Sequence, residues 1–494
     1  MLLTTLIKDL EFVKLKGDLS IDVSGIAYDS REVANNGVFV AMPGFKMDGH
    51  DFIQQAIDMG ANTIIIEKDL YIEDNITVLK VTDSRKALAR IASNFYNKPT
   101  EKLNMVGITG TNGKTSITYF IKSIFDHVNK STGLIGTIGT MIDNKIMQNK
   151  NTTPESLNLQ AIFNNMLKVN TENCIMEVSS HSLSLNRVAY CEFNTGIFTN
   201  LTPDHLELHK NMEEYFNAKA ELFEMTRDYN IINADDEYGR RLIERVKNYD
   251  AKLVTYGIEN EADIYATDIF YSVEFTKYTL NTPKGSIEIT VNIPGIIYVY
   301  NSLAAIACAY CNGIDLNDIQ KGIKELKSIK GRFEVVYTDQ DYKIIVDFAH
   351  TEDGLEKTLT TIKPFAKGRI ILVFGVYAAP GEKGRGKRRA MGKVAAKYSD
   401  FAVVTSDNPK EQDPNLIIQE IVEAIKEENG KHIAIVDRKE AIKYAIGISN
   451  KDDIILIAGK GHETSQVIGK EEIPFNETEI VTEIIKTSRE MKIS

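Results

Sequence analysis

The feature that most constrains this chain is a glycine-rich stretch between a predicted strand and a predicted helix. The strand covers residues 103–108, and apolar residues at helical spacing follow over residues 117–128. Amides at a helix N-terminus, a lysine ammonium and a hydroxyl together hold a polyphosphate and its Mg²⁺. We therefore predict that ATP binds to the residues of this stretch: Gly110, Thr111, Asn112, Gly113, Lys114, Thr115 and Ser116.

One position of the stretch departs from the common phosphate-binding pattern. The pattern has a glycine six residues before the lysine, where this chain has Ile108, with Gly107 before it and Gly110 after it. A glycine-rich turn without function is the alternative interpretation. The Gly-Lys-Thr run and the flanking elements favour phosphate binding, with Lys114 as a catalytic cation and Thr115 as a magnesium ligand.

Length, charge and cysteine content limit the classes of protein to which the chain can belong. Its 494 residues predict about two to four domains. The net charge of -11 argues against nucleic-acid binding. The longest apolar run, residues 370–374, is too short for membrane insertion, and residues 1–10 lack the apolar core of a signal peptide. Because the cysteines are scattered, with Cys308 and Cys311 in a helical pattern, we expect a reduced, cytoplasmic protein.

Breaks in the pattern divide the chain into three predicted domains. Residues 97–100, Asn-Lys-Pro-Thr, interrupt it just before the strand of the phosphate-binding stretch, and strands alternate with helices after Gly331. We predict domains at residues 1–100, 101–330 and 331–494. The fold class is α/β, with a parallel sheet in the central domain and a doubly wound, Rossmann-like sheet in the third.

Polar side chains follow several predicted strands, at the sheet edge where ligands of parallel sheets bind. In the central domain Glu177 ends one apolar strand and His205 follows another. With the phosphate-binding stretch, these residues predict a site for ATP and Mg²⁺. In the third domain, polar runs begin at Asp347, Thr405 and Gly459.

A segment dense in positive charge, residues 380–389, follows a central strand of the third domain. We expect it to form a loop. A solvated basic loop and an anion-binding lid are both consistent with the composition, and the position after the strand favours the lid.

A series of short motifs occurs in a fixed order along nearly the whole chain. They are Asp-Ser-Arg at 29–31, Asp-Gly-His at 48–50, Gly-Thr-Asn-Gly-Lys-Thr at 110–115, Glu-Val-Ser-Ser-His at 177–181, Asn-Leu-Thr-Pro-Asp-His at 200–205, Tyr-Phe-Asn-Ala-Lys at 215–219, Gly-Arg-Phe-Glu at 331–334, Asp-Phe-Ala-His at 347–350, Ser-Asp-Asn-Pro at 406–409 and Gly-Lys-Gly-His-Glu at 459–463. In these motifs the chain resembles the Mur ligase family, and within it the branch that forms UDP-N-acetylmuramoyl tripeptide.

The resemblance implies an ATP-dependent ligase of peptidoglycan precursor synthesis. A UDP-sugar-binding N-terminal domain, a central ATPase and a mobile C-terminal amino-acid-binding domain are implied. The substrates implied are ATP, UDP-N-acetylmuramoyl-L-Ala-D-Glu and a diamino acid, and the cofactor is Mg²⁺. We expect the protein to act as a monomer.

The resemblance also assigns roles to individual positions. It places Ser30 near the UDP, and four residues around the muramoyl dipeptide: Thr152, Thr153, Ser179 and Arg187. It places four residues around magnesium: Thr115, Glu177, His205 and a carbamylated Lys219. Four further residues would contact ATP: Asn301, Arg332, Asp347 and His350. The incoming amino acid would meet Asp407, Asn408, Lys410, Gly459 and Glu463.

The chemistry agrees with these roles. A carboxylate reacts poorly with amines because its leaving group would be oxide, so transfer of the γ-phosphate to make an acyl phosphate activates it. Two anions must then meet, and cations such as Lys114, Mg²⁺ and Arg187 have to neutralise them. Carbamylation would turn Lys219 from a cation into an anion that holds metal. Together with Lys114 and His205, Lys219 is a predicted catalytic residue.

Several positions differ from the family pattern. Glu207 stands for the usual aspartate and Glu352 for a proline, residues 295–298 read Gly-Ile-Ile-Tyr where the family has Gly-x-Phe-Asn, and the loop at residues 376–388 is longer and altered. The most consequential is Lys410, where relatives that add meso-diaminopimelate have an arginine. Lysine keeps the positive charge without the two-pronged geometry.

We expect meso-diaminopimelate to be the third residue, because a cation at Lys410 should repel the side chain of L-lysine. A ligase adding L-lysine or another amino acid stays open, as does a folylpolyglutamate-synthetase-like enzyme. A nucleotide-dependent switch without ligase chemistry is a further alternative, and the ordered motifs after Gly331 count against it.

Overall fold

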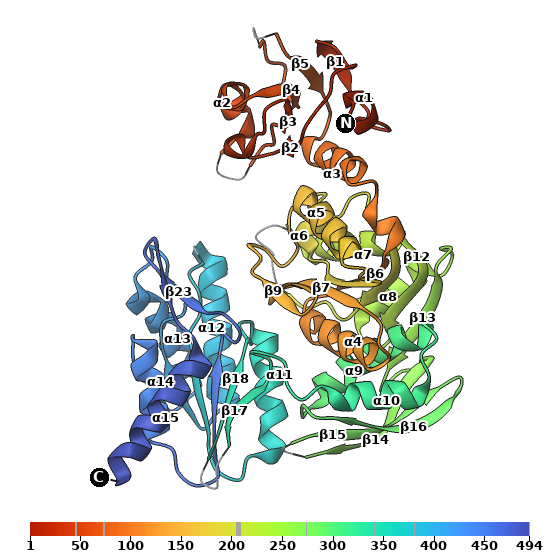
Figure 1. Ribbon diagram of the computed structural model, residues 1–494. Coiled ribbons are helices and arrows are strands. Elements are labelled where there is room, and N and C mark those ends of the chain that lie inside the picture. The colour runs from red at the N-terminus through yellow and green to blue at the C-terminus, as the bar shows by residue number, and fades with distance from the viewer. Residues whose placement is uncertain are drawn as a thin grey trace. The chain divides into compact units, whose positions relative to one another are not determined.

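The computed structural model of the protein describes residues 1–44, 47–72, 75–203, 209–272, 274–338, 342–379 and 381–493. The chain divides into two compact units, Met1–Ile264 with Ala304–Asp318, and Tyr265–Leu303 with Ile319–Ser494. Figure 1 labels their helices and strands. Within the described ranges, no helix is long and apolar enough to cross a membrane.

The first unit begins with a five-stranded sheet in the order β1-β5-β4-β3-β2, in which only β1 is antiparallel to its neighbour. Helices α1 and α3 pack on one face, and α2 packs on the other. Asp83 caps α3 by accepting a hydrogen bond from the Lys86 amide. The elements are α1 Leu3–Leu6, β1 Val13–Lys16, β2 Ile26–Ala27, η1 Ser30–Glu32, β3 Gly37–Val40, η2 Gly49–Phe52, α2 Ile53–Asp58, β4 Ala61–Ile66, β5 Thr77–Lys80, α3 Ser84–Phe95 and η3 Pro99–Lys102.

The same unit continues with a mostly parallel sheet in the order β13-β12-β11-β6-β10-β7-β8-β9, whose last two strands form an antiparallel edge. The central strands are buried apolar runs, as expected for a sheet covered on both faces. The elements are β6 Asn104–Thr109, α4 Lys114–His127, β7 Thr132–Gly136, β8 Gly139–Ile142, β9 Lys145–Met147, α5 Ser156–Lys168, β10 Asn173–Glu177, α6 Ser180–Ser184, β11 Phe193–Phe198, α7 Met212–Glu224, β12 Thr226–Asn233, α8 Glu237–Val246 and β13 Lys252–Gly257.

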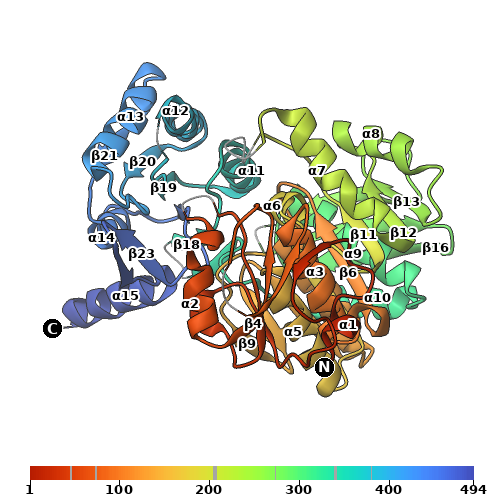
Figure 2. The same cartoon turned by 90° about the horizontal axis from the view of Figure 1, so that it is seen from above.

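The second unit contains an antiparallel set of three strands and a doubly wound sheet. The sheet runs β17-β18-β22-β19-β20-β21, parallel except for β17. Helices α14 and α15 cover one face, and α12 packs beside α13 (Figure 2). The elements, of which α9 and α10 share residues with the first unit, are β14 Ile264–Tyr271, β15 Thr276–Thr282, β16 Gly285–Val291, α9 Ile296–Cys311, α10 Leu316–Glu325, β17 Glu334–Thr338, β18 Tyr342–Asp347, α11 Glu352–Ile362, η4 Lys363–Phe365, β19 Ile370–Phe374, α12 Gly381–Tyr398, β20 Phe401–Val404, α13 Pro414–Glu427, β21 His432–Ala434, α14 Arg438–Gly447, β22 Asp453–Ala458, β23 Ser465–Ile468, β24 Glu471–Pro474 and α15 Glu477–Ile493.

Most of the predicted elements are confirmed, including the strand and helix around the phosphate-binding stretch and the alternation after Gly331. The loop predicted at residues 380–389 is wrong from Gly381 onward, because this segment is the first half of α12. Arg388 is buried there, pairs with Glu420 of α13 and donates to the Ala379 carbonyl oxygen at 2.9 Å. This packing against α13 fixes a helix in a segment whose glycines favour a loop. Cys308 and Cys311 both lie in α9, as the helical pattern predicted; Cys308 is buried and Cys311 is half-buried.

Candidate functional site

The phosphate-binding stretch connects β6 to α4 through two glycines with positive φ. Gly110 has φ +142° and Gly113 has φ +91°, and the Gly113 residue caps α4. A β-carbon at Gly110 would lie 1.9 Å from Thr199 Oγ1, so only glycine lets the loop pass this close to its neighbour. Thr115 and Ser116 are buried in the first turn of α4. The loop and the helix N-terminus thus have the form that a phosphate requires.

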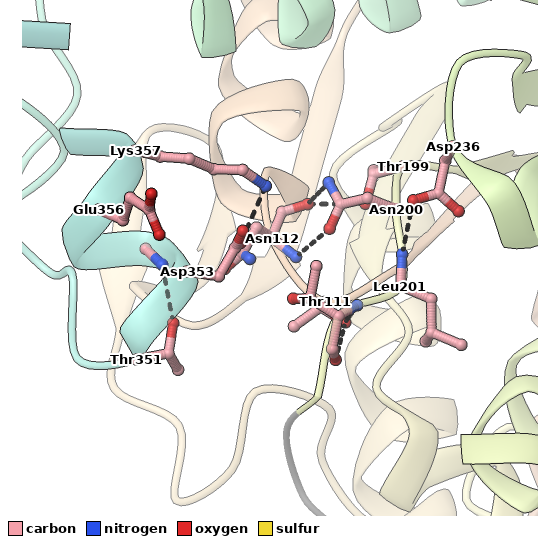
Figure 3. Close-up of polar contacts among 12 residues, drawn as sticks. Thr111, Asn112, Thr199, Asn200, Leu201, Asp236, Thr351, Asp353, Glu356 and Lys357 are labelled. Carbon is pink, nitrogen blue, oxygen red and sulfur yellow. Dashed lines mark hydrogen bonds and ion pairs between the residues drawn. The ribbon is translucent and has the colours of Figure 1, made fainter. Parts of the chain in front are cut away.

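The segment after β11 holds this loop in place (Figure 3). The Thr111 amide donates to the Asn200 carbonyl oxygen at 2.8 Å, and the Asn112 amide donates to Asn200 Oδ1 at 3.0 Å. Thr199 Oγ1 donates to the Asn112 carbonyl oxygen at 2.6 Å. The segment is itself held by Asp236, whose Oδ2 accepts from the Leu201 amide at 3.2 Å. The loop is therefore ordered by contacts of the fold itself.

Lys114 turns back over its own loop. Its Nζ donates to the carbonyl oxygens of Gly110 and Thr111, at 2.9 and 2.8 Å. Both acceptors belong to the same stretch, so the ammonium lies where the loop would hold phosphate. This is the placement expected of a lysine that neutralises a transferring phosphoryl group.

Glu177 lies at the end of β10 and is 1% exposed. Its Oε1 accepts from Thr115 Oγ1 and from the Thr137 amide, each at 2.9 Å, and its Oε2 accepts from Thr137 Oγ1 at 2.9 Å. A β-carbon at Gly136 would lie 2.3 Å from Oε1, so the carboxylate also needs this glycine. Mg²⁺ prefers oxygen ligands, and the Thr115 hydroxyl and the Glu177 carboxylate are hydrogen-bonded oxygen donors at one point. These residues fit the predicted metal.

Lys219 projects from α7 toward the same loop. Its side chain is buried, its Nζ donates to the Gly110 carbonyl oxygen at 2.8 Å, and it lies 4.6 Å from the centroid of the Tyr215 ring. A carbamate on Nζ would keep one N–H for Gly110 and add two acceptor oxygens beside the phosphate-binding loop. The placement fits the predicted modification. His205, the remaining predicted magnesium ligand and catalytic residue, lies outside the described residues.

The residues predicted around the muramoyl dipeptide also converge, near the end of β10. Thr153 Oγ1 donates to the Glu177 carbonyl oxygen at 2.8 Å and lies 3.3 Å from Ser179 Oγ. Arg187 donates to the Thr153 carbonyl oxygen at 3.0 Å, and Thr152 Oγ1 lies 3.3 Å from the Thr137 hydroxyl. Residues brought here by different elements therefore form one cluster beside Glu177.

A second cluster joins this region to the N-terminal sheet. Glu155 pairs with Arg187 at 3.5 Å and with Arg85 of α3 at 3.3 Å. Tyr28 donates to Asn158 Oδ1 at 2.9 Å, and burial, together with the Glu155 charge, raises its pKa. Ser30, predicted near the UDP, is buried in η1 and donates to Gln55 Oε1 at 2.8 Å.

In the second unit, three of the four predicted ATP contacts, Arg332, Asp347 and His350, lie together near the end of β18. The Asp347 carboxylate accepts from the amides of Phe333 and Ala349, at 2.6 and 2.8 Å. Burial raises its pKa, and the Arg332 charge opposes the rise. Arg332 lies 4.3 Å from the centroid of the Phe348 ring, and His350 packs on the same ring at 4.5 Å. Asn301 is buried in α9.

The predicted amino-acid residues lie on the loops after β20 and β22. Asn408 Nδ2 donates to Glu463 Oε2 at 3.3 Å. A β-carbon at Gly459, whose φ is +118°, would lie 2.9 Å from Asp407 Oδ2, so the two loops touch. Lys410 is exposed, and its backbone is held by β23: its amide donates to the Val467 carbonyl oxygen at 3.1 Å. The structure thus brings the five predicted residues to neighbouring loops.

Several residues in these clusters were not predicted from the sequence. Thr137 donates twice to Glu177, and Asn200 accepts twice from the phosphate-binding stretch. Thr137 directly follows β7, so the strand-end argument that found Glu177 applies to it as well. Asn200 is the first residue of the motif at residues 200–205, in which only His205 was predicted to act in the site. Lys460 is buried between two predicted amino-acid ligands, and no pattern in the sequence indicates its burial.

Comparison with known proteins gives consistent matches along the chain. Three family models match: "Mur ligase family, catalytic domain" at residues 22–96, "Mur ligase middle domain" at residues 108–309 and "Mur ligase, glutamate ligase domain" at residues 331–461.

Relatives of high identity are UDP-N-acetylmuramoyl-L-alanyl-D-glutamate--2,6-diaminopimelate ligases. That of Caldanaerobacter subterraneus subsp. tengcongensis is 45% identical over 96% of this chain and 97% of its own length. That of Clostridioides difficile is 44% identical over 98% and 99%. A solved structure of a ligase with the same name superposes with a TM-score of 0.71, at 28% identity and covering 99% of both chains.

A folylpolyglutamate synthase from Mycobacterium tuberculosis shares the fold alone, at 15% identity and a TM-score of 0.63 over 76% of this chain and 92% of its own. The three family models and the relative of 45% identity across 96% of the chain lead to one conclusion: this chain belongs to the Mur ligase family and has its three-domain α/β architecture.

Proposed function

We propose that this protein adds meso-diaminopimelate to UDP-N-acetylmuramoyl-L-Ala-D-Glu, with ATP as the energy source, in the synthesis of peptidoglycan precursors. The observation that carries the proposal is the convergence of Lys114, Glu177 and Lys219 on one phosphate-binding loop. The names of relatives that align over nearly the entire chain support the choice of substrates. We place this reaction in the cytoplasm, with domains at residues 1–100, 101–330 and 331–494.

In the proposed reaction, the substrate carboxylate attacks the γ-phosphorus of ATP, ADP leaves and an acyl phosphate forms. The amine of the amino acid then attacks the acyl carbon, and phosphate leaves with the former carboxylate oxygen. The loop amides and Lys114 bind the phosphates and offset their charge as the two anions approach. Arg187 and Thr153 orient the carboxylate of the muramoyl dipeptide.

Magnesium would be held by Thr115, Glu177, a carbamylated Lys219 and His205, and it supplies neutralisation of phosphate charge. The chain's own part is to present these oxygens together. Glu177 is buried, with both oxygens hydrogen-bonded by Thr115 and Thr137, so it cannot swing away from the loop. Such preorganisation avoids reorganisation at the moment of reaction.

The amino-acid site is proposed to lie on the loops that carry Asp407, Asn408, Lys410, Gly459 and Glu463. The carboxylates of Asp407 and Glu463 suit an ammonium group, and Lys410 suits a distal carboxylate. An amino acid whose far end carries both an ammonium group and a carboxylate matches these side chains better than L-lysine, which has only the ammonium group there. Asn301, Arg332, Asp347 and His350 are proposed to contact ATP.

The proposal is tested by measuring phosphate release and amide formation with UDP-N-acetylmuramoyl-L-Ala-D-Glu, ATP and a panel of amino acids. We expect a tripeptide product with meso-diaminopimelate and little with L-lysine or L-glutamate. Lys114→Ala should abolish turnover, and Lys86→Ala, in the first unit but on the exposed side of α3, is the matched control.

Each other result has a definite meaning in this assay. Product with L-lysine in place of meso-diaminopimelate would contradict the choice of amino acid. Phosphate release without the muramoyl peptide would contradict ligase chemistry. Glutamate addition to a folate would favour a folylpolyglutamate-synthetase-like enzyme.

A further inference from the structure

Lys460 is a buried lysine in the loop after β22, and its side chain is 0% exposed. Its Nζ donates to Glu463 Oε2 at 2.7 Å and to Asn408 Oδ1 at 3.1 Å. A buried ammonium is stable in a protein only when paired and hydrogen-bonded. Both of these hydrogen-bond partners are residues of the proposed amino-acid site.

The contacts of Asn408 fix the orientation of its side-chain carboxamide. Its Oδ1 also accepts from the Val467 amide at 2.9 Å, while its Nδ2 donates to Glu463 Oε2 at 3.3 Å. An ammonium can only donate, so Lys460 forces the carboxamide oxygen toward itself and the amide nitrogen toward Glu463. Lys460, Asn408 and Glu463 therefore form a closed ring of hydrogen bonds across the two loops.

The backbone around Lys460 is shaped for this inward side chain. Gly459 and Gly461, on either side, have φ values of +118° and +54°, and the Glu463 amide donates to the Lys460 carbonyl oxygen at 3.0 Å. A β-carbon at Gly461 would lie 2.7 Å from the Gly331 carbonyl oxygen. The loop thus turns tightly enough for the side chain of Lys460 to reach the carboxylate of Glu463, three positions later.

A second buried cation, Arg438, contacts the same two loops where each of them begins. Arg438 is 0% exposed and pairs with Glu477, also 0% exposed, at 2.7 Å. The same guanidinium donates to the carbonyl oxygen of Ala458 at 2.8 Å and to that of Ser406 at 3.4 Å. These carbonyls lie where the loops leave β22 and β20. The Arg438 hydrogen bonds to these carbonyls do not include Lys460, so loss of Lys460 leaves them in place and should disturb mainly the loop residues near Asn408 and Glu463.

We propose that Lys460 is a positioning residue for the amino-acid substrate: it holds the Glu463 carboxylate and the Asn408 carboxamide in one geometry between the two loops. The inference rests on the proposed function and deepens it. Glu463 keeps 35% of its side chain exposed, while its Oε2 accepts hydrogen bonds from Lys460 and Asn408. Lys460 acts through these residues and is not itself a ligand.

The test is steady-state kinetics of Lys460→Met and Lys460→Gln with meso-diaminopimelate, ATP and the muramoyl dipeptide. Loss of a charge-assisted hydrogen bond predicts that KM for meso-diaminopimelate rises about tenfold or more, while KM for ATP and for the muramoyl dipeptide stays within about twofold. Lys470→Met is the matched control, because Lys470 is 88% exposed on the neighbouring hairpin, and it should leave all three constants unchanged.

A double-mutant cycle with Glu463→Gln separates positioning from general destabilisation. If Lys460 acts through Glu463, Lys460→Gln should add little to KM in the Glu463→Gln background. Additive effects, or an equal rise of all three KM values, would overturn the proposal. Circular-dichroism melting identifies a variant that fails to fold. If the methionine variant does not fold, the test rests on the glutamine variant, whose side-chain amide can still donate a hydrogen bond to Glu463.

The wild-type reaction distinguishes this inference from the proposed function. If the wild-type protein forms no amide with any amino acid, the proposed function fails. If it forms the tripeptide and both Lys460 variants keep a normal KM for meso-diaminopimelate, only the positioning role fails.

Discussion

The buried ammonium of Lys219 donates a hydrogen bond to the Gly110 carbonyl oxygen, 2.8 Å away. This bond ties the middle of α7 to the first glycine of the phosphate-binding loop, across more than a hundred residues of sequence. Lys114 donates to the same carbonyl oxygen at 2.9 Å. Two lysine nitrogens at one acceptor repel each other while both are charged, and conversion of one to a carbamate anion would remove the repulsion.

We predict that Lys219→Ala lowers turnover by about 100-fold or more, because it removes a group that supports metal and phosphate charge. Short carboxylic acids added to the variant should restore part of the activity by occupying the space of the missing carbamate. Phosphate release with and without formate or acetate measures this. Lys168→Ala, an exposed lysine on α5, should behave as wild type in both conditions. Full activity of Lys219→Ala without rescue would contradict the carbamate.

We predict that Gly110→Ala weakens ATP binding while leaving the fold intact. The added β-carbon would lie 1.9 Å from Thr199 Oγ1, and residues with a side chain rarely adopt the φ of +142° found here. Overpacking of this kind costs about 1–3 kcal/mol, which corresponds to about 5- to 150-fold in affinity if the strain displaces the loop from its ATP-binding conformation. Isothermal titration calorimetry with a non-hydrolysable ATP analogue measures the change.

The matched control for this glycine is Gly447→Ala at the end of α14. A β-carbon there meets no atom within 4 Å, so the variant should be neutral or slightly more stable. ATP affinity that is unchanged in Gly110→Ala would contradict the role given to the loop. A large fall in the melting temperature with little change in ATP affinity would mean that the added methyl group disturbs the fold and not the ATP site.

The sequence was informative where a local pattern determines the chemistry. Lys114, Thr115 and Glu177 were predicted because glycines, a strand end and a helix start specify where backbone and side chain point. Lys219 gave no such pattern, since a lysine on a helix is normally solvated, and only the family resemblance identified it. Its burial depends on packing of α7 against the loop, which a local pattern does not contain.

The errors have the same origin. The glycines between residues 381 and 386 favoured a loop, but Arg388 and Met391 are buried against neighbouring elements and stabilise α12. Tertiary packing overrides propensity in such a segment. Lys460 was missed because a lysine between two glycines is usually exposed, and its burial depends on Asn408 of another motif as well as on Glu463 of its own.

Lys410 is predicted to act on the amino acid alone. Its backbone is fixed by two hydrogen bonds, to the Val467 carbonyl oxygen at 3.1 Å and from the Gly469 amide at 2.7 Å, while its side chain is exposed. Lys410→Gln should raise KM for meso-diaminopimelate about tenfold, because a charge-assisted hydrogen bond is lost. Lys410→Arg should lower it, because arginine can bind a carboxylate with two parallel hydrogen bonds. A change in KM for ATP in either variant would contradict this placement.

Asp347 is predicted to make stability depend on pH. Burial raises its pKa above the ordinary value of 3.8, despite Arg332 and the amides of Phe333 and Ala349. The folded protein thus keeps this proton to a higher pH than the unfolded chain does. The stability that the group contributes is fully present below pH 3.8 and is lost as the pH rises through the raised pKa. Asparagine does not titrate, so the free energy of unfolding of wild type relative to Asp347→Asn should fall as the pH rises.

Urea unfolding of both proteins between about pH 4 and about pH 7, followed by circular dichroism, measures this difference. The comparison cancels titration of all other groups, because the two chains differ at one position. A difference that stays constant would mean that Asp347 titrates alike in the folded and unfolded states. A difference that grows in favour of wild type as the pH rises would mean that Arg332 and the amide donors outweigh burial, and that the Asp347 pKa is lowered.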